Sequence, residues 1–436
     1  MNRRRLWLLP LLLAALVGGS WYFGFRAKTS DRELPVYVKG AERLVAGEEI
    51  YRRGTDNKPF TYPPFAAVSF VPMTWIATEW QAPVWFAVNF AILLLLARWL
   101  HAYARRDVPE SGPPRLLWFW LLTVLVGARH VLSVLANQSH DLFIAGLVGL
   151  SAAAWCRNRA SAAIWAGVGA AIKATPLLFL GLFVVRLRVF AIVLLVLVFV
   201  GLTALPDWWF PRADGGSWWR AWYEVNLRVL EVGGTASAPG AWNSHSILNQ
   251  SLTGTLVRWF TPVTTPDPSF VLGGAGTVLV GSLSPTWFRI VSLLSQLAVL
   301  GLIAFGVRRA ARFVRQSADP GQAQQLVGLG EVATIACGMV LLSPQSSKAH
   351  FCVWVFPAAF LADRLLRGRR DVWAIVLLAA AFLTGATPKD LLGKELGNRL
   401  LAYGNVTWST VLLLLATVRC LCTVTRPNPT RAEESA

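Results

Sequence analysis

The chain has 436 residues, of which 55% are hydrophobic and only 15% are charged, whereas a soluble domain carries close to a quarter charged residues. Its apolar residues form continuous blocks near the roughly 20 residues that a helix needs to cross a bilayer, which excludes a soluble domain and a barrel of alternating strands. The net charge of +18 lies mostly beside these blocks, so we expect membrane lipids and no nucleic acid as partners. The composition therefore predicts an all-α polytopic transmembrane protein.

Residues 1–24 combine a basic start, Arg3 to Arg5, with a long apolar run that ends in Trp-Tyr-Phe. A cleaved signal peptide has the same order of basic and apolar residues, but the aromatic end in place of a small-residue cleavage site favours an uncleaved first span. The positive charges then place the N-terminus in the cytoplasm and residues 25–64, the first extracytoplasmic loop, on the outer side.

This outer loop is rich in polar groups. Asp31 or Glu33 could act as a general base that accepts the proton of a sugar hydroxyl, although juxtamembrane acids are also often merely solvated. Tyr37 and Tyr62 suit contacts with a sugar or a lipid headgroup. The pattern of residues 36–46, which include Tyr37, predicts a short helix that lies on the membrane surface. Its apolar face is expected to carry Val36, Gly40, Leu44 and Val45.

Further membrane helices are predicted at 65–80, 83–102, 115–128, 141–156, 189–206, 286–306, 327–343, 351–363, 372–388 and 407–424. With the first span and the segment 160–186, they make a bundle of about 10–12 membrane helices, within one integral membrane domain at 1–430. A long extracytoplasmic loop at 207–285 is expected to carry a short interfacial helix near Trp218, and residues 425–436 form a polar tail. No internal repeat of the kind found in two-halved transporters is visible.

The segment 160–186 has basic residues at both ends and is interrupted by Lys173 and Pro176. Either one kinked helix crosses the membrane, or two half-helices enter it and return. Lysine and broken backbone at membrane depth are tolerated only against a cavity or the protein interior. Lys173 is therefore expected to face a phosphate-bearing lipid, the alternative being a lysine that extends to the interface.

Two polar motifs lie between the later apolar blocks. NSHSILNQSLTGTLVR (243–258) offers Asn249, Gln250 and Ser251 for sugar hydroxyls and Arg258 for a phosphate. LLSPQSSKAHFCVW (341–354) places Lys348 and His350 among serines, where polar atoms are costly. We expect Lys348 to contact substrate and His350 to donate to a leaving phosphate.

Other catalytic classes lack their motifs. The chain has no Walker loop, no GxGxxG after a strand, no HExxH and no GxSxG elbow. Its five cysteines show no CxxC pair, and no cluster of His and Cys residues has zinc-ligand spacing. We therefore expect no metal site and no nucleotide-driven transport.

Five stretches carry a family resemblance: VYVKGAERLVAGEEIY, FTYPPFAAVSFVP, AAIKATPLLF, NQSLTGTLVR and SPQSSKAHFCVWVFP. In their order and spacing the chain resembles the polytopic glycosyltransferases of family 87, which share the GT-C architecture. The resemblance implies transfer of a hexose, often mannose, from a polyprenyl-phosphate-linked donor to a lipid-linked or glycan acceptor. It places the active site at the outer face of the plasma (inner) membrane of a bacterium. It implies no cofactor, although two nearby acids would also suit Mg2+ or Mn2+.

The resemblance also implies roles for single residues. The family's base is an Asp four residues before the tyrosine of the first motif, which is the position of Glu33, and Asp31 lies two residues earlier. Either acid is thus the expected base. Lys173, His350 and the loop residues Asn249, Gln250, Ser251 and Arg258 match family positions, whereas Ser347 and Lys348 replace an aromatic-rich run. A flippase for lipid-linked saccharides and a non-catalytic family member are the alternatives.

Overall fold

The computed structural model describes residues 8–26, 32–52, 58–106, 113–228, 243–263, 272–367, 371–385 and 392–424. Within these ranges the chain is helical throughout and contains no strand, which confirms the predicted all-α class. The first half of the chain forms α2 (Leu8–Gly19), η1 (Ser20–Arg26), α3 (Leu34–Val45), α4 (Pro64–Thr74), α5 (Thr78–Arg105), α6 (Pro113–Asn137), α7 (Asp141–Cys156), α8 (Ser161–Ile172), η2 (Thr175–Leu178), α9 (Phe179–Val185) and α10 (Val189–Trp209). The second half forms α11 (Trp218–Trp222), η3 (Tyr223–Leu227), α12 (Leu252–Phe260), α14 (Pro285–Gln316), α15 (Pro320–Leu341), η4 (His350–Trp354), α16 (Val355–Arg367), α17 (Val372–Gly385), α19 (Lys394–Ala402) and α20 (Asn405–Val424).

Six of these helices, α5, α6, α10, α14, α15 and α20, are long and apolar enough to cross a membrane. Shorter apolar helices, among them α4, α7, α8 and α17, pack between them. The outward faces of the long helices carry large apolar side chains, as contact with lipid requires. The chain is therefore an integral multi-pass membrane protein.

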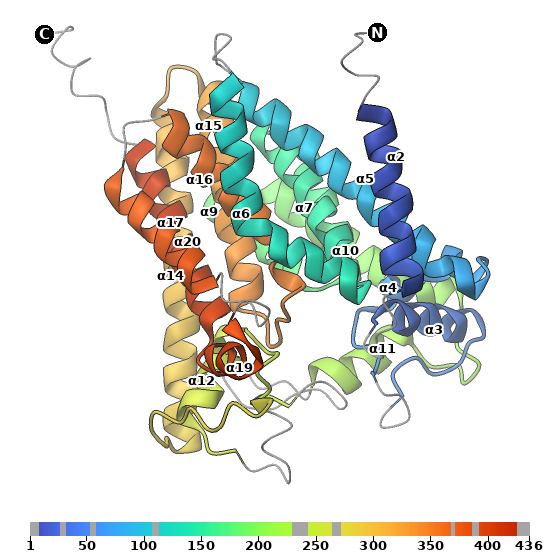
Figure 1. The fold of residues 1–436 in the computed structure, drawn as a ribbon. Coiled ribbons are helices and arrows are strands. Elements are labelled where there is room, and N and C mark those ends of the chain that lie inside the picture. The colour runs from blue at the N-terminus through green and yellow to red at the C-terminus, as the bar shows by residue number, and fades with distance from the viewer. Residues whose placement is uncertain are drawn as a thin grey trace, which may run out of the picture.

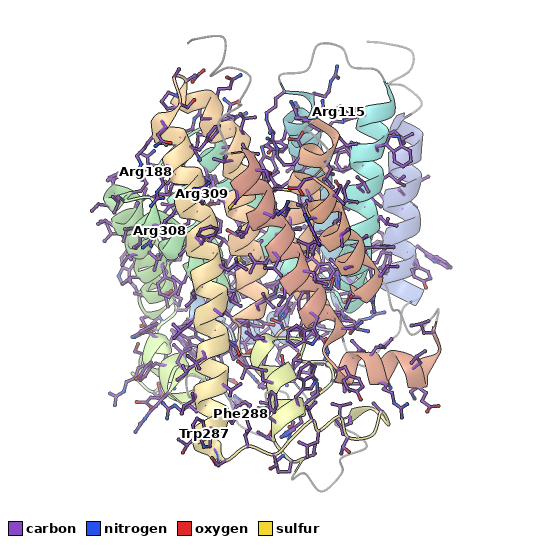
Figure 2. The ribbon with its side chains drawn as sticks, turned by 90° about the vertical axis from the view of Figure 1, so that its left-hand side faces the viewer. Arg115, Arg188, Trp287, Phe288, Arg308 and Arg309 are labelled. Carbon is purple, nitrogen blue, oxygen red and sulfur yellow. The ribbon has the colours of Figure 1, made fainter. Side chains whose placement is uncertain are left out.

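The helices run roughly side by side, and the two ends of the bundle differ (Figure 1). The first and last described residues of the chain, at the start of α2 and the end of α20, lie at one end, whereas the short helices α3, α11, α12 and α19 gather at the other. Arg115, Arg188, Arg308 and Arg309 lie toward the end where α2 begins, and Trp287 lies at the opposite end (Figure 2). These arginines lie toward one end of the bundle, which is the pattern that the positive-inside rule describes.

The helix predicted at 36–46 forms as α3, and one of its faces packs inside the protein. Leu34, Tyr37, Ala41 and Leu44 are buried, whereas Val45 is 52% exposed. These buried positions follow the spacing of one helical face. Of the predicted apolar face, Gly40 and Leu44 are buried. Tyr37 is buried as well, and its hydroxyl has partners inside the protein.

Several predicted spans have different ends in the structure, and two of them bear on the site. The span predicted at 65–80 is the short helix α4, which ends at Thr74. The span predicted at 115–128 continues to Asn137 as α6. Its polar continuation is stable inside the bundle because His130 is paired with the carbonyl oxygen of Lys348 and Arg129 donates to the carbonyl oxygen of Gly385.

The segment 160–186 enters the bundle and returns, as the second alternative predicted. The helix α8 ends at Ile172, and η2 and α9 lead back to Arg188, whose guanidinium donates to the side chain of Asn158. Asn158 precedes α8, so both ends of the segment lie at the same end of the bundle. Lys173 is therefore at the tip of a re-entrant hairpin.

Candidate active site

The carboxylate of Asp141 is the centre of a buried polar cluster. Lys173 Nζ lies 2.5 Å from Oδ1, and His350 Nε2 lies 3.8 Å from Oδ2. The hydroxyl of Ser139 donates to the same Oδ2 atom. Asp141 is also the first residue of α7, where the helix dipole favours negative charge. An acid, a lysine and a histidine from three distant segments therefore meet at one point.

Asp141 is positioned by the turn that joins α6 to α7. Gln138 has φ +53°, a left-handed conformation that residues other than glycine rarely adopt. Hydrogen bonds from three elements hold the turn: Trp85 Nε1 donates to the Gln138 carbonyl oxygen (3.2 Å), Gln138 Nε2 donates to the Phe23 carbonyl oxygen (2.9 Å), and Glu33 N donates to the Asn137 carbonyl oxygen (2.9 Å). The last bond ties the outer segment directly to the cluster.

Lys173 reaches Asp141 because α8 stops there. Its backbone is extended, with φ −147° and ψ 118°, and Pro176 lies in the first turn of η2. A proline lacks the N–H needed to continue a helix, so α8 cannot run on through this point. The ammonium group is buried, as expected for a lysine that faces the protein interior and not the interface.

A hydrogen-bonded chain runs from the outer segment to the turn. The Tyr37 hydroxyl donates to Glu33 Oε2 at 2.5 Å and lies 2.7 Å from His140 Nδ1. Since the hydroxyl proton is directed to Glu33, Nδ1 of His140 carries the ring proton and donates to Tyr37. Burial lowers the pKa of His140 to about 3, which keeps the ring neutral. Its Nε2 atom is buried without a hydrogen-bond partner among the described residues.

Glu33 differs from Asp141 in its electrostatic setting. Burial raises the pKa of the Glu33 carboxyl, and the negative charge of Asp141 raises it further, while the Tyr37 hydrogen bond and Lys173 lower it. Asp141, by contrast, is held by an ammonium group in direct contact. Of the two carboxyl groups, Glu33 is therefore the more easily protonated.

His350 presents a donor to the cluster. The backbone N–H of Ser347 donates to His350 Nδ1 at 3.3 Å, so a neutral ring carries its proton on Nε2. This atom faces Asp141. The 3₁₀ turn η4, which begins at His350, follows the serine-rich loop and fixes the ring at the edge of the cluster.

A cavity adjoins Asp141, Lys173 and His350. Its wall is completed by Ile144, Thr175, Met339, Val340, Ser346 and Val353. The ring of Tyr62 lies against His140, with ring centroids 4.5 Å apart, and the Lys173 ammonium is 6.0 Å from the Tyr62 ring centroid. The cavity lining thus combines charged, polar and apolar side chains.

The other predicted site residues form a second network beside this cavity. Arg258 is fully buried, and its guanidinium donates to the carbonyl oxygens of Ala402 (2.8 Å), Ser246 (2.9 Å) and Asn249 (2.7 Å). The structure therefore gives Arg258 protein partners and does not bring it to Asp141.

Asn249, Gln250 and Ser251 connect the two polar loops. The Asn249 side chain donates to the Pro344 carbonyl oxygen and accepts from the Ser346 N–H, and Gln250 N donates to the Ser346 carbonyl oxygen. Ser251 Oγ donates to Pro344 as well. Ser346 in turn lines the cavity. These residues thus support the loop that precedes His350, whereas Lys348 is half-buried and does not line the cavity.

The predicted site residues did not include Asp141 and His140. Both belong to the polar run NQSHD (137–141), which ends at the start of the span predicted at 141–156. A carboxylate between two membrane helices is itself costly, and this signal could have identified it. Asp31 lies outside the described residues. Within the described ranges, no group of three His, Cys, Asp or Glu side chains is placed to hold a metal ion.

Comparison with known proteins identifies relatives of this chain and a family model that matches it. The chain is 26% identical to a polyprenol-phosphate-mannose-dependent alpha-(1-2)-phosphatidylinositol mannoside mannosyltransferase of Mycobacterium tuberculosis, over 95% of this chain and 91% of that protein. It is also 26% identical to a protein of the same description from Mycolicibacterium smegmatis, over 86% of this chain and 81% of that protein. No solved structure gives a significant match. The model of glycosyltransferase family 87 matches residues 60–344, well over half of the chain, including Asp141 and Lys173. The chain therefore belongs to glycosyltransferase family 87.

Proposed function

We propose that this membrane glycosyltransferase transfers a hexose, with mannose as the expected sugar, from a polyprenyl-phosphate-linked donor to a lipid-linked or glycan acceptor. The observation that carries the proposal is a buried cation, Lys173, held by Asp141 beside a cavity that His350 also lines. Two positive or donating groups at one point suit a phosphate. The printed names of both relatives state dependence on polyprenol-phosphate-mannose, which supports the same donor here.

In the proposed reaction, Glu33 takes the proton of an acceptor hydroxyl. The hydroxyl oxygen forms a bond to the anomeric carbon as the bond from that carbon to the phosphate oxygen breaks, and the lipid phosphate leaves with the bonding electrons. Lys173 and His350 stabilise the negative charge that develops on the phosphate. Asp141 is a poor base because it is paired with Lys173, and its role is to hold Lys173 and His350 in place. Tyr37 positions Glu33.

We place this site on the extracytoplasmic side. The arginines at the end where α2 begins mark that end as cytoplasmic. The amphipathic helix α3 and the Asp141 turn then lie toward the outer face, where a lipid-linked sugar and a surface acceptor can meet (Figure 1).

The proposal is tested by transfer of radiolabelled mannose from polyprenyl-phosphate-mannose by the purified protein in lipid nanodiscs. Phosphatidylinositol mannoside is the first acceptor to use, since it is named for both relatives. Labelled, chain-extended lipid is the expected product. Absence of transfer from every lipid-linked hexose would favour a non-catalytic member, and movement of the lipid between leaflets without transfer would favour a flippase.

The pH dependence of kcat/KM for transfer should reflect protonation of the Glu33 carboxyl. Because its pKa is raised above the ordinary value of 4.5, the base is lost by protonation as the pH falls through the raised pKa. We expect kcat/KM to decline on the acid side at a pH above that of an ordinary glutamate. If kcat/KM of Glu33→Asp declines at the same acidic pH as that of the unmodified protein, the group that titrates there is not Glu33.

Replacing Arg258 should mainly destabilise the protein. Arg258→Met leaves several buried carbonyl oxygens without a donor, which is expected to cost at least about 3 kcal/mol. Thermal unfolding in detergent measures the loss, and Arg308→Met, a change at an exposed arginine, is the matched control. An unchanged unfolding midpoint together with lost transfer would instead support the phosphate-binding role.

A further inference from the structure

A second charged cluster surrounds Asp363, near the C-terminal end of α16. Its carboxylate is fully buried. Four arginines contact it: Arg106 (3.1 Å), Arg115 (3.2 Å), Arg364 (3.3 Å) and Arg367 (2.6 Å). Four guanidinium groups against one carboxylate leave a formal charge of +3. We call these five residues the Asp363 cluster.

The carboxylate cannot satisfy all the donors around it. Oδ1 accepts from Arg115 and Arg367, and Oδ2 accepts from Arg106 and Arg364, which uses the roughly four acceptor positions of a carboxylate. The Nε–H groups of Arg106, Arg115 and Arg364 are nevertheless buried without a hydrogen-bond partner within the described part of the chain. Unpaired buried donors on charged groups are unfavourable, so among the described residues the cluster lacks an acceptor.

The location of the cluster indicates what that acceptor is. Arg106 follows the end of α5, Arg115 lies in the first turn of α6, and the remaining members lie at the end of α16. Figure 2 shows Arg115 at the end of the bundle where α2 begins. Directly along α6, Leu117 and Trp118 are 67% and 52% exposed, as side chains in contact with lipid are. Excess positive charge thus adjoins an apolar outer surface.

We propose that the Asp363 cluster binds the phosphate group of an anionic lipid at the cytoplasmic end of the bundle, with an acyl chain along Leu117 and Trp118. Guanidinium groups match phosphate oxygens in pairs of hydrogen bonds. The cytoplasmic leaflet supplies anionic headgroups at this depth. The bound phosphate would neutralise part of the excess charge and would bring the ends of α5, α6 and α16 together. This site is separate from the Asp141 cavity and does not depend on the proposed transfer reaction.

The test measures retention of phosphatidylglycerol by the purified full chain in native mass spectrometry, after exchange into nanodiscs that also contain phosphatidylcholine. The site variant carries Arg115→Gln and Arg364→Gln. The control carries Arg308→Gln and Arg312→Gln, two exposed arginines of α14, and so removes the same charge. We expect phosphatidylglycerol affinity to fall at least about tenfold in the site variant only, as for loss of a charge-assisted hydrogen bond. An equal fall in both variants, or no fall in either, would overturn the proposal.

Two further measurements test the proposal independently of the glutamine variant. Arg115→Lys with Arg364→Lys retains the charge but removes the paired donors, so an affinity equal to that of the unmodified chain would refute the guanidinium geometry even if the glutamine variant fails to fold. Inorganic phosphate distinguishes the source of the anion. If millimolar phosphate raises the unfolding temperature and phosphatidylglycerol does not, the lipid assignment is wrong.

Discussion

Replacement of Glu33 by glutamine is expected to lower kcat for hexose transfer by about 10²–10⁴-fold, the usual contribution of a general base. Glutamine keeps the acceptor oxygen that the Tyr37 hydroxyl uses, so the outer segment and its bond to the Asn137 turn should persist. What is lost is the ability to take the acceptor proton. KM for the donor should change little, since the donor phosphate is assigned to Lys173 and His350. Single-turnover transfer from labelled polyprenyl-phosphate-mannose measures the effect.

Asp31→Asn is the decisive companion, because Asp31 is the other acid that the family resemblance allows. A large loss in Asp31→Asn with full activity in Glu33→Gln would move the base to Asp31, and full activity in both variants would remove the base from this segment. Tyr37→Phe takes away the hydrogen bond to Glu33 and the acceptor of His140 Nδ1. It should cost about tenfold, in keeping with loss of the bond to the charged Glu33. Normal activity in Tyr37→Phe would refute its positioning role.

The sequence was most informative where composition alone determines structure. Continuous apolar blocks predict membrane helices because lipid leaves no alternative for the backbone, and the all-α class followed from this. Helix ends were less predictable. The polar residues Arg129 and His130 suggest that a span ends before them, yet α6 continues past them. The helix can continue because Arg129 donates to the carbonyl oxygen of Gly385 and His130 pairs with the carbonyl oxygen of Lys348, both more than 200 residues away in the chain. Such partners cannot be seen in a local pattern.

The same limit explains the site. Lys173 and His350 were identifiable because a charge or an imidazole among apolar residues is costly and needs a reason. Asp141, where they meet, carries the same signal, but an acid at the start of a helix also has an ordinary local explanation in the helix dipole. Arg258 shows another limit of a local pattern. A conspicuous arginine in a polar loop suggested phosphate, but in the structure its guanidinium is occupied by backbone carbonyls.

Replacement of Lys173 by methionine is expected to lower kcat by about 10²–10³-fold, the range for loss of one group that stabilises developing charge. This single variant also leaves Asp141 as a buried carboxylate without its cation, which typically destabilises a protein by about 3–5 kcal/mol. Reduced activity alone would therefore not separate a catalytic lysine from a structural one. Thermal unfolding must be measured together with transfer.

The double variant Asp141→Asn with Lys173→Met separates the two roles. Removing both charges eliminates the unpaired carboxylate, so the unfolding temperature should recover most of what Lys173→Met loses. Transfer should remain as low as in the single variant, because no cation then faces the departing phosphate and His350 Nε2 no longer has a carboxylate beside it. If instead the double variant regains activity along with stability, the ion pair serves the fold alone, and the phosphate must be stabilised by other groups of the cavity.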